Sequence, residues 1–272
     1  MDRWPELRRR LPRGLPLKTI SSRDNPLFQA LRALSSDRRA RRQAGKTLLD
    51  GPHLLESALQ GGVGVERLVF SQDAAEGELG AWRHRLPGVP ALVVPDRLFA
   101  ALSPVEAPAG LLSVIAIPVP PSRPAECVVL LEQIQDPGNL GALFRVAAAA
   151  GVTAAHLSPG CAEAWSPKCL RGGQGAHFQM EIHEGRNLPE FSRAFGGPIH
   201  AAVLGAPRTL FELDLRGPAG FAFGNEGAGL SDSLRAATQP FSIPMPGRVE
   251  SLNVATAAAV CLFERVRQKL AG

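Results

Sequence analysis

The sequence predicts an α/β protein in two parts: a small α/β domain, then a larger domain built on a mainly parallel sheet. Short apolar segments of strand length alternate with helical segments along most of the chain. A proline-rich segment at residues 118–124 (P-V-P-P-S-R-P) divides the two parts. Such a segment forms a stiff, extended linker. The basic residues are concentrated well before that linker, which indicates different tasks for the two parts.

Charge is distributed unevenly along the chain. Residues 1–50 contain 13 lysines and arginines against 5 acidic residues, whereas the remainder contains 17 against 20. A basic arm on a nearly neutral body suits a polyanion, and nucleic acid is the first candidate. The alternative is a solvated tail that only aids solubility. Prolines and a glycine interrupt the arginines of residues 1–15, so we expect a flexible basic arm there.

Several classes of protein are disfavoured. No run of 18 apolar residues is present, so we expect no membrane span. No apolar stretch of signal-peptide type follows the first residues, which favours a cytoplasmic protein. The four cysteines form no C-x-x-C pair and the six histidines no i, i+4 pair. We therefore expect a reduced protein without a metal site.

Residues 16–117 are predicted to form the small domain. Leu27, Phe28, Leu31 and Leu34 recur at helical spacing, and this helix is expected to continue to an arginine cluster before Gly45. Four arginines in five positions exceed what a helix dipole needs, so we expect nucleic-acid contacts here. Those predicted contacts are Arg23, Arg38, Arg39, Arg41 and Arg42. Further strands are expected at residues 47–50, 65–70, 91–94 and 111–117, and helices at 52–60, 76–85 and 96–102.

Residues 125–272 are predicted to form the larger domain. Expected strands are residues 128–132, 154–158, 178–182, 199–204, 221–223 and 241–243, and expected helices are 140–150, 167–172, 188–195, 231–237 and 251–270. Strands that alternate with helices form a mainly parallel sheet covered on both faces. Ligands on such sheets bind beyond the carboxyl ends of the strands. Three loops at such positions therefore carry the functional prediction.

The first loop, D-P-G-N-L-G, follows the first strand of the larger domain. Asn139 is expected to cap the next helix, which is apolar on nearly every face except at Arg145. A guanidinium stays charged, so it must meet an anion or reach solvent. Two interpretations remain open: a structural ion pair with Glu132 or Glu226, or binding of a phosphate or developing oxyanion.

The second loop, G-N-E-G-A-G-L, contains three glycines that allow backbone to approach a ligand closely. It contains no basic residue, and Glu226 would repel a phosphate. It therefore suits a neutral or cationic cofactor, such as an adenosine that bears a sulfonium, although a plain turn is the alternative. A Rossmann-type enzyme is disfavoured, because its glycine motif should follow the first strand of the domain, where D-P-G-N-L-G stands instead.

The third loop, residues 243–253, contains a turn at Pro244, Pro246 and Gly247, and a helix is expected to begin at Ser251. That helix is apolar nearly all round, which indicates burial. Polar groups at the edge of a core need partners. Ser251 is therefore either an N-cap only or part of a site.

These three loops resemble a known family. Asn139-x-Gly141-x-x-x-Arg145, then Gly224-Asn225-Glu226-Gly227-x-Gly229-Leu230, then Ile243-Pro244-Met245-x-Gly247 with Glu250-Ser251-Leu252-Asn253-Val254 resemble, in order and spacing, the motifs of the SpoU (TrmH) family. These are RNA ribose 2′-O-methyltransferases of the SPOUT superfamily. Residues 17–117 resemble the ribosomal-protein-like substrate-binding domain that often precedes the catalytic one.

The resemblance implies a trefoil knot in residues 125–272, S-adenosylmethionine as cofactor, and a homodimer formed through the knotted domain. It implies cofactor binding by Gly224, Asn225, Gly227, Ile243, Met245 and Leu252. It implies catalytic roles for Asn139, Arg145, Glu226, Ser251 and Asn253. Lys168 and Arg171, in a further matching segment, join the expected RNA contacts. Ribosomal RNA is the expected substrate; transfer RNA, or a non-catalytic RNA-binding protein of the same fold, is the alternative.

Overall fold

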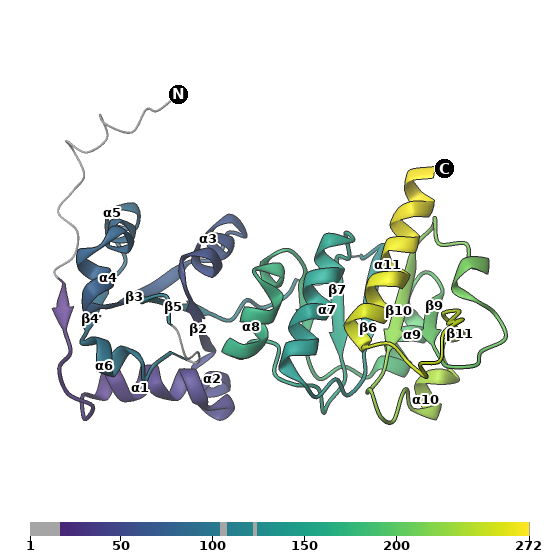
Figure 1. The fold of residues 1–272 in the computed structure, drawn as a ribbon, viewed down its shortest axis with the longest axis horizontal. Coiled ribbons are helices and arrows are strands. Elements are labelled where there is room, and N and C mark those ends of the chain that lie inside the picture. Colours follow the sequence, from purple (N-terminus) through teal and green to yellow (C-terminus); the bar gives the residue numbers. More distant parts are fainter. Residues whose placement is uncertain (1–16, 104–107, 122–123, 272) are drawn as a thin grey trace. The chain divides into compact units, whose positions relative to one another are not determined.

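A computed structural model gives the fold and describes residues 17–103, 108–121 and 124–271 (Figure 1). These residues form two compact units. The first extends to Pro118 and includes Trp165–Pro167, and the second comprises the rest of the chain from Val119. Within these ranges no helix combines the length and apolarity that crossing a membrane requires. The expected basic arm, residues 1–15, and residues 122–123 of the expected linker lie outside the described residues.

The first unit is built on a mixed sheet with the strand order β1-β4-β3-β5-β2. Strand β5 is antiparallel to β2 and β3, and the other pairs are parallel. The strands are β1 (Lys18–Thr19), β2 (Lys46–Asp50), β3 (Val65–Ser71), β4 (Ala91–Val94) and β5 (Leu111–Ala116). The helices are α1 (Pro26–Ser36), α2 (Arg38–Ala44), α3 (Pro52–Gln60), α4 (Gln72–Glu76), η2 (Glu78–Ala81), α5 (Trp82–Arg85) and α6 (Asp96–Phe99).

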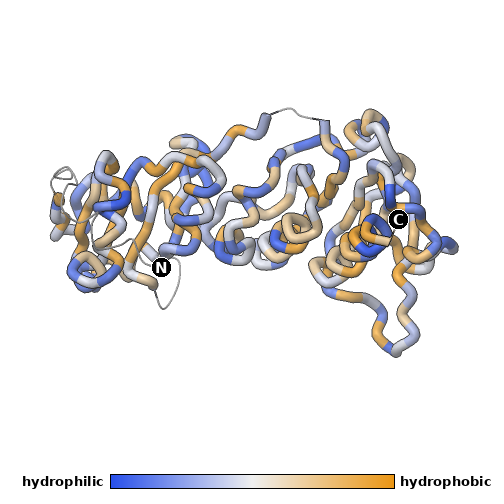
Figure 2. The backbone as a smooth tube through the Cα atoms, turned by 90° about the horizontal axis from the view of Figure 1, so that it is seen from above, coloured by the Kyte–Doolittle hydropathy of each residue, from blue (hydrophilic) through white to orange (hydrophobic). Residues whose placement is uncertain are grey.

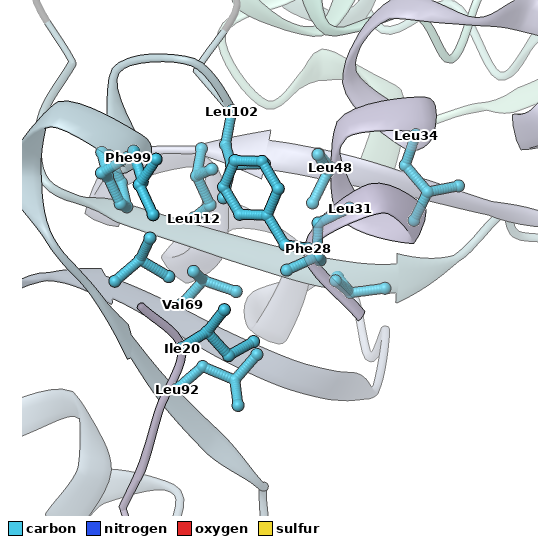
Figure 3. Close-up of a cluster of buried hydrophobic side chains, with 13 residues drawn as sticks. Ile20, Phe28, Leu31, Leu34, Leu48, Val69, Leu92, Phe99, Leu102 and Leu112 are labelled. Carbon is cyan, nitrogen blue, oxygen red and sulfur yellow. The ribbon is translucent and has the colours of Figure 1, made fainter. Parts of the chain in front are cut away.

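Alternating strand residues build a core on each face of this sheet. In β4, Leu92 and Val94 join a cluster with Phe28 of α1, whereas Ala91 and Val93 join a second cluster with Trp82 of α5. Successive strand side chains point to opposite faces, so helices must cover both. Figure 3 shows the first cluster, in which α1 and α6 supply side chains against the strands.

The arginine-rich region departs from the sequence prediction. One helix was expected through residues 27–42, but the chain breaks at Asp37 into α1 and α2. Asp37 is extended, and its carboxylate accepts a hydrogen bond from Arg39 N at 2.7 Å, which starts a new helix. Gly45 ends α2 in the left-handed conformation. The single helix expected at residues 76–85 is likewise wrong, because α4 ends at Glu76 and two short helices follow Gly77.

The second unit is built on a parallel sheet with the order β11-β9-β10-β6-β7-β8. The strands are β6 (Cys127–Leu131), β7 (Ala154–Leu157), β8 (Glu181–His183), β9 (Ile199–Ala202), β10 (Ala219–Phe223) and β11 (Gln239–Phe241). The helices are α7 (Pro137–Ala149), α8 (Pro167–Gly173), η3 (Ala176–Phe178), α9 (Leu188–Ala194), η4 (Leu210–Glu212), α10 (Asp232–Arg235) and α11 (Val254–Ala271). The expected α/β class with mainly parallel pairing is confirmed.

Helices lie on both sides of this sheet. Leu188 of α9 and Leu234 of α10 are buried with Val128, Leu130 and Ala201 of the strands. Helix α11 packs against α7 and against β10. Figure 2 shows apolar and polar residues mixed along the helix that leads to the C-terminus, consistent with one face buried and the other in solvent.

Two boundaries in the second unit differ from expectation. The strand expected at residues 178–182 is β8 (Glu181–His183), because η3 occupies Ala176–Phe178. The C-terminal helix begins at Val254 and not at Ser251. Asn253 Oδ1 accepts from Ala255 N at 3.0 Å, so Asn253 starts this helix and Ser251 is no N-cap.

Candidate functional site

Asn139 links the three loops that follow β6, β10 and β11. Its Nδ2 donates to Glu226 Oε1 of the second loop at 2.5 Å, and its Oδ1 accepts from Asn253 Nδ2 of the third loop at 3.0 Å. The strands are parallel, so their carboxyl ends share one edge of the sheet. Residues far apart in the sequence therefore meet through a single side-chain amide.

The side-chain amide of Asn139 can bridge the loops because another residue of the first loop caps helix α7. Asp136, and not Asn139, caps α7: its Oδ1 accepts from Asn139 N at 2.8 Å, and Pro137 occupies the first turn. The cap assigned to Asn139 from the sequence is wrong, because the chain turns one residue before Pro137. The hydrogen bond from Asn139 N, aided by Lys168, lowers the pKa of Asp136. Lys168 Nζ lies 3.2 Å from Asp136 Oδ2.

Gly141 allows α8 to cross α7 closely, behind the first loop. A Cβ at this position would lie 2.4 Å from Cys169 O and 2.8 Å from Gly173 N. Real Cβ atoms essentially never approach backbone so closely, so only glycine fits. The glycine of the first motif therefore serves helix packing, which fixes the position of Asn139 two residues earlier.

The second loop is held by its own contacts. A Cβ at Gly224 would lie 2.3 Å from Gly229 O, so the loop closes tightly on itself there. Asn225 Oδ1 accepts from Gly227 N at 2.9 Å and Ala228 N at 3.0 Å, and its Nδ2 donates to Gln133 O at 3.1 Å. The Asn225 side chain thus shapes the loop and ties it to the end of β6.

A cavity of about 320 Å³ lies between the second and third loops. Ligand pockets commonly start at about this size. Its wall contains every residue expected to bind cofactor, namely Gly224, Asn225, Gly227, Ile243, Met245 and Leu252. Glu226 and Ser251 also line it. Exposed backbone and apolar side chains suit an adenosine, and the Glu226 carboxylate suits a cationic sulfonium, so these residues fit the expected cofactor.

Arg145 lies on α7 with an exposed side chain. It is not part of the cavity wall, and it forms no ion pair with any residue of the described part of the chain. The structural ion pair with Glu132 or Glu226 is therefore wrong. Glu132 accepts from Ser231, and Glu226 accepts from Asn139. A solvated guanidinium near this loop stays available for an external anion.

Comparison with known families settles the assignment. Residues 126–263 match the model of the SpoU rRNA Methylase family, which is half of the chain. The chain belongs to the SpoU rRNA methylase family. Residues 25–113 separately match an MRM3-like substrate binding domain. The resemblance read from the three motifs is confirmed.

Members of the SpoU family align with nearly the whole chain. An uncharacterised tRNA/rRNA methyltransferase of Synechocystis is 36% identical over 94% of this chain and 96% of its own length. The 23S rRNA (guanosine(2553)-2′-O)-methyltransferase RlmP of Bacillus subtilis is 32% identical over 91% and 98%. The structure of the SpoU methyltransferase AviRb of Streptomyces viridochromogenes with AdoMet superimposes with a TM-score of 0.82, 28% identity, and coverage of 91% and 99%.

These findings confirm the expected activity class and cofactor: the chain is an RNA methyltransferase of the SpoU family, and its methyl donor is S-adenosylmethionine. In this chain, the residues that suit methyl transfer from this donor are those of the cavity wall and those joined by the Asn139 side chain.

The arginines expected to bind RNA differ in their surroundings. Arg23, Arg38, Arg39 and Arg42 are exposed in the first unit, and Arg171 is exposed in the second. Arg41 is only 4% exposed, and its Nη1 donates to Leu34 O at 2.7 Å and to Ser35 O at 3.2 Å. Arg41 is therefore withdrawn as an RNA contact, because its guanidinium joins α2 to the end of α1.

The sequence interpretation missed the roles of several residues at this edge of the sheet. Arg235 of α10 lines the cavity, Gln133 anchors the second loop, and Glu132 holds Ser231. Asp136 was identifiable, since aspartate directly before a proline at the first helical position is a common cap. Glu132 also carried a signal, because it is an acidic residue at the end of an otherwise apolar strand. No sequence feature distinguished Arg235.

Proposed function

We propose that this SpoU-family enzyme methylates a ribose 2′-hydroxyl in large-subunit ribosomal RNA. The observation that carries the proposal is the Asn139 side chain, which joins Glu226 and Asn253 beside a cavity that fits the methyl donor. The similar RlmP of Bacillus subtilis is named for a 23S rRNA 2′-O reaction. The MRM3-like domain supports a folded RNA as the substrate. Ribosomal RNA also makes the cytoplasm the proposed location.

S-adenosylmethionine supplies a sulfonium-bound methyl group for an in-line displacement, and the chain supplies orientation and electrostatics. A ribose hydroxyl is a poor nucleophile, so its oxygen must gain negative charge as its proton passes to solvent. Arg145 cannot act as a base, because a guanidinium stays protonated in proteins. We assign it to bind the neighbouring phosphate and to stabilise the forming alkoxide, a role that in other enzymes contributes about 3–4 kcal/mol.

The remaining polar residues have positioning roles in this proposal. Asn139 holds Glu226 and Asn253 in place, so that the walls of the cavity cannot separate. The Glu226 carboxylate, which lines the cavity, would hold the cationic cofactor by charge. Ser251, which is exposed and lines the cavity, orients the ribose.

The RNA surface is proposed to include the exposed arginines Arg23, Arg38, Arg39 and Arg42 of the first unit. Each phosphate contact contributes to the salt dependence of binding, by a slope of about 0.7–0.9 in log K against log salt. Substituting Arg39 and Arg42 by alanine should therefore weaken RNA binding and lower the slope by roughly 1.5. The matched control is Arg97→Ala, which removes an exposed arginine from α6. An unchanged slope would exclude this surface.

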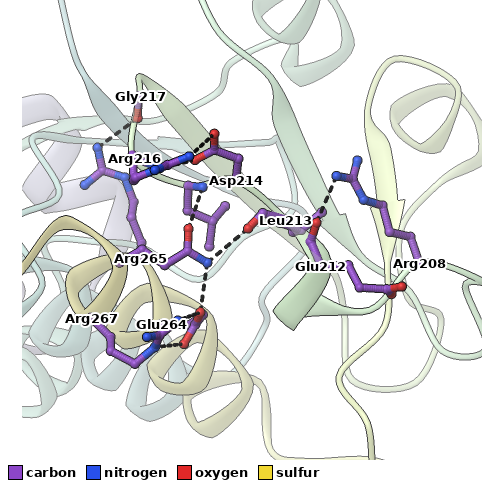
Figure 4. Close-up of polar contacts among 11 residues, drawn as sticks. Arg208, Glu212, Leu213, Asp214, Arg216, Gly217, Glu264, Arg265 and Arg267 are labelled. Atoms are coloured by element: carbon purple, nitrogen blue, oxygen red, sulfur yellow. Dashed lines mark hydrogen bonds and ion pairs between the residues drawn. The ribbon is translucent and has the colours of Figure 1, made fainter. Parts of the chain in front are cut away.

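A trefoil knot in the second unit is proposed from its contacts. The segment that leaves β11 is held by the β9–β10 connection: Ser242 N donates to Arg208 O at 2.9 Å, and Leu210 N donates to Ser242 O at 2.8 Å. Later, Gln268 of α11 bonds Leu215 N at 2.9 Å and Leu213 O at 3.0 Å (Figure 4). The β9–β10 connection thus contacts the C-terminal segment twice, just after β11 and again near the end of α11. A crystal structure in which residues 243–253 pass outside the 203–218 loop would exclude the knot.

A homodimer through the knotted domain is also proposed. Phe263 and Leu270 of α11 are 47% and 83% exposed, which leaves apolar area for a second copy. Light scattering should give twice the mass of one chain. Phe263→Asp combined with Leu270→Asp should give a monomer, and a monomeric wild type would overturn the proposal.

The reaction is tested with purified protein, tritiated S-adenosylmethionine and transcribed RNA. Label should enter large-subunit ribosomal RNA and appear, after alkaline hydrolysis, in dinucleotides that resist cleavage, because a 2′-O-methyl group blocks attack on the adjacent phosphate. Label in a base, or in transfer RNA alone, would contradict the proposal. Binding of the cofactor without transfer to any cellular RNA would favour a non-catalytic RNA-binding protein.

A further inference from the structure

Glu132 is a buried carboxylate outside the cavity wall. It follows β6 directly, and the residue is 8% exposed. Its backbone N donates to Phe223 O at 2.9 Å, so the pairing of β6 with β10 continues to the residue before Gly224. Glu132 therefore contacts the exact start of the second loop.

The carboxylate of Glu132 contacts the other end of the same loop. Its Oε2 accepts from Ser231 N at 2.7 Å, and its Oε1 accepts from Ser231 Oγ at 2.7 Å. Hydrogen bonds to an ionised oxygen are short and stronger than neutral ones. Ser231 Oγ in turn accepts from Leu234 N at 3.3 Å, which starts α10. One side chain thus fixes the point where the loop enters the helix.

Residues 224–230 between these two anchors form one wall of the cavity. The middle of the loop is tied to the neighbouring residue, since Asn225 Nδ2 donates to Gln133 O. Gln133 itself has a φ of 53°, an uncommon conformation for a residue other than glycine. The end of β6 is thus shaped to hold the loop at its start, middle and end.

We propose that Glu132 is a positioning residue for the cofactor: by fixing Phe223 and Ser231 it holds the glycine-rich loop in the shape that S-adenosylmethionine binds. This inference rests on the proposed cofactor cavity. A loop without this anchor must lose conformational entropy when the cofactor binds, which weakens affinity. The side chains of Asn139 and Arg145 are not altered, so the effect falls on binding and not on the chemical step.

The test measures cofactor affinity by calorimetry in Glu132→Ala, Ser231→Ala and Ser231→Thr. We expect the Kd for S-adenosylmethionine to rise about tenfold in Glu132→Ala, in line with loss of a charge-assisted pair, and less in Ser231→Ala, which keeps the backbone donor. Ser231→Thr, which retains the hydroxyl, should restore affinity. In turnover, the KM for S-adenosylmethionine should rise while kcat changes little.

The matched control is Glu264→Gln. Glu264 is equally buried, at 8% exposed, and accepts from Arg267 and Gln268 on α11 (Figure 4). It is not part of the cavity wall. The Glu264→Gln variant should lower the melting temperature as Glu132→Ala does, yet leave the Kd for S-adenosylmethionine within about twofold of the wild type. Amide exchange at Gly227 and Ala228 should accelerate in Glu132→Ala and not in the control.

A further variant separates the two proposals. Leu252→Asp places a charge in the cavity wall and should abolish cofactor binding if the cavity is correct. A wild-type Kd in Glu132→Ala and Ser231→Ala, with binding lost in Leu252→Asp, would overturn the positioning role alone. A wild-type Kd in all three would overturn the cavity, and the positioning role with it.

Discussion

Asn253 Nδ2 donates to Asn139 Oδ1 at 3.0 Å, across 114 positions of sequence. The same Asn253 starts α11 through its Oδ1, and the same Asn139 reaches Glu226 through its Nδ2. Each amide therefore uses both of its ends, and neither can be rotated without breaking a second contact. The proposed active site is thus coupled to the position of the C-terminal helix.

Asn139→Asp should disable the enzyme with little loss of fold. The change replaces the donor to Glu226 by a second carboxylate, and an unsatisfied or repelled group costs about 1–3 kcal/mol. We expect kcat/KM to fall by roughly tenfold to a hundredfold in a tritium transfer assay. Asn187→Asp is the control, because Asn187 caps α9 and aspartate caps equally well. Equal activity of the two variants would contradict the bridge.

Arg145→Ala should lower kcat by about a hundredfold or more if the guanidinium stabilises the alkoxide. The residue is exposed and unpaired within the described part of the chain, so the melting temperature and the Kd for S-adenosylmethionine should stay at wild-type values. Arg193→Ala, an exposed arginine of α9, should leave kcat unchanged. Lost cofactor affinity with retained kcat would assign Arg145 to the cofactor instead.

Gly141→Ala should destabilise the second unit. The added Cβ would meet Cys169 O at 2.4 Å and Gly172 C at 2.9 Å, and forced overpacking costs about 1–3 kcal/mol. Denaturant unfolding measures the change. Gly196→Ala, where nothing lies within 4 Å of the added Cβ, should leave the free energy of unfolding nearly unchanged. Wild-type stability in Gly141→Ala would show that α7 and α8 separate easily.

Acid should destabilise the protein through buried histidines. Burial lowers the pKa of His156 to about 3, and that of His177 and of His200 to about 4, from 6.5. The unfolded chain then binds protons that the folded chain does not, so stability is fully present above about pH 6.5 and falls steadily towards pH 4. Unfolding measured across this range should show that loss, and a flat profile would contradict it.

One variant isolates a single histidine. His200 packs against the rings of Phe221 and Phe241, at centroid distances of 5.9 Å and 6.4 Å. His200→Phe should reduce the pH slope by up to about 1.4 kcal/mol per pH unit, the value for one proton. An unchanged slope would show that His200 takes no part in acid unfolding.

Periodicity and motif order were sufficient to predict the two-part α/β class, and most strands and helices of the second unit were placed within a few residues. The start of α11 was missed because Ser251 and Asn253 are equally good caps in sequence. Only the tertiary contact from Asn253 to Asn139 selects between them. The break between α1 and α2 at Asp37 was also missed, because the spacing of apolar residues does not show where a carboxylate caps a new helix.

Some of the site residues could be predicted from the sequence, and others could not. The cavity wall contains every cofactor residue expected from the motifs, because glycines and short apolar residues mark places where backbone is exposed. The arginine cluster could not be resolved from sequence, because Arg41 and Arg42 are adjacent and chemically identical. Helical geometry turns Arg41 inward to the carbonyls of Leu34 and Ser35, while Arg42 stays in solvent.

The solvated state of Arg145 has a kinetic consequence. A guanidinium already locked to a carboxylate would have to be released before each round of substrate capture, and that release would slow the encounter. Arg145 has no such partner among the described residues, so a phosphate replaces only water around it. Association should therefore be fast at low ionic strength and should slow steeply as counter-ions compete for the same guanidinium.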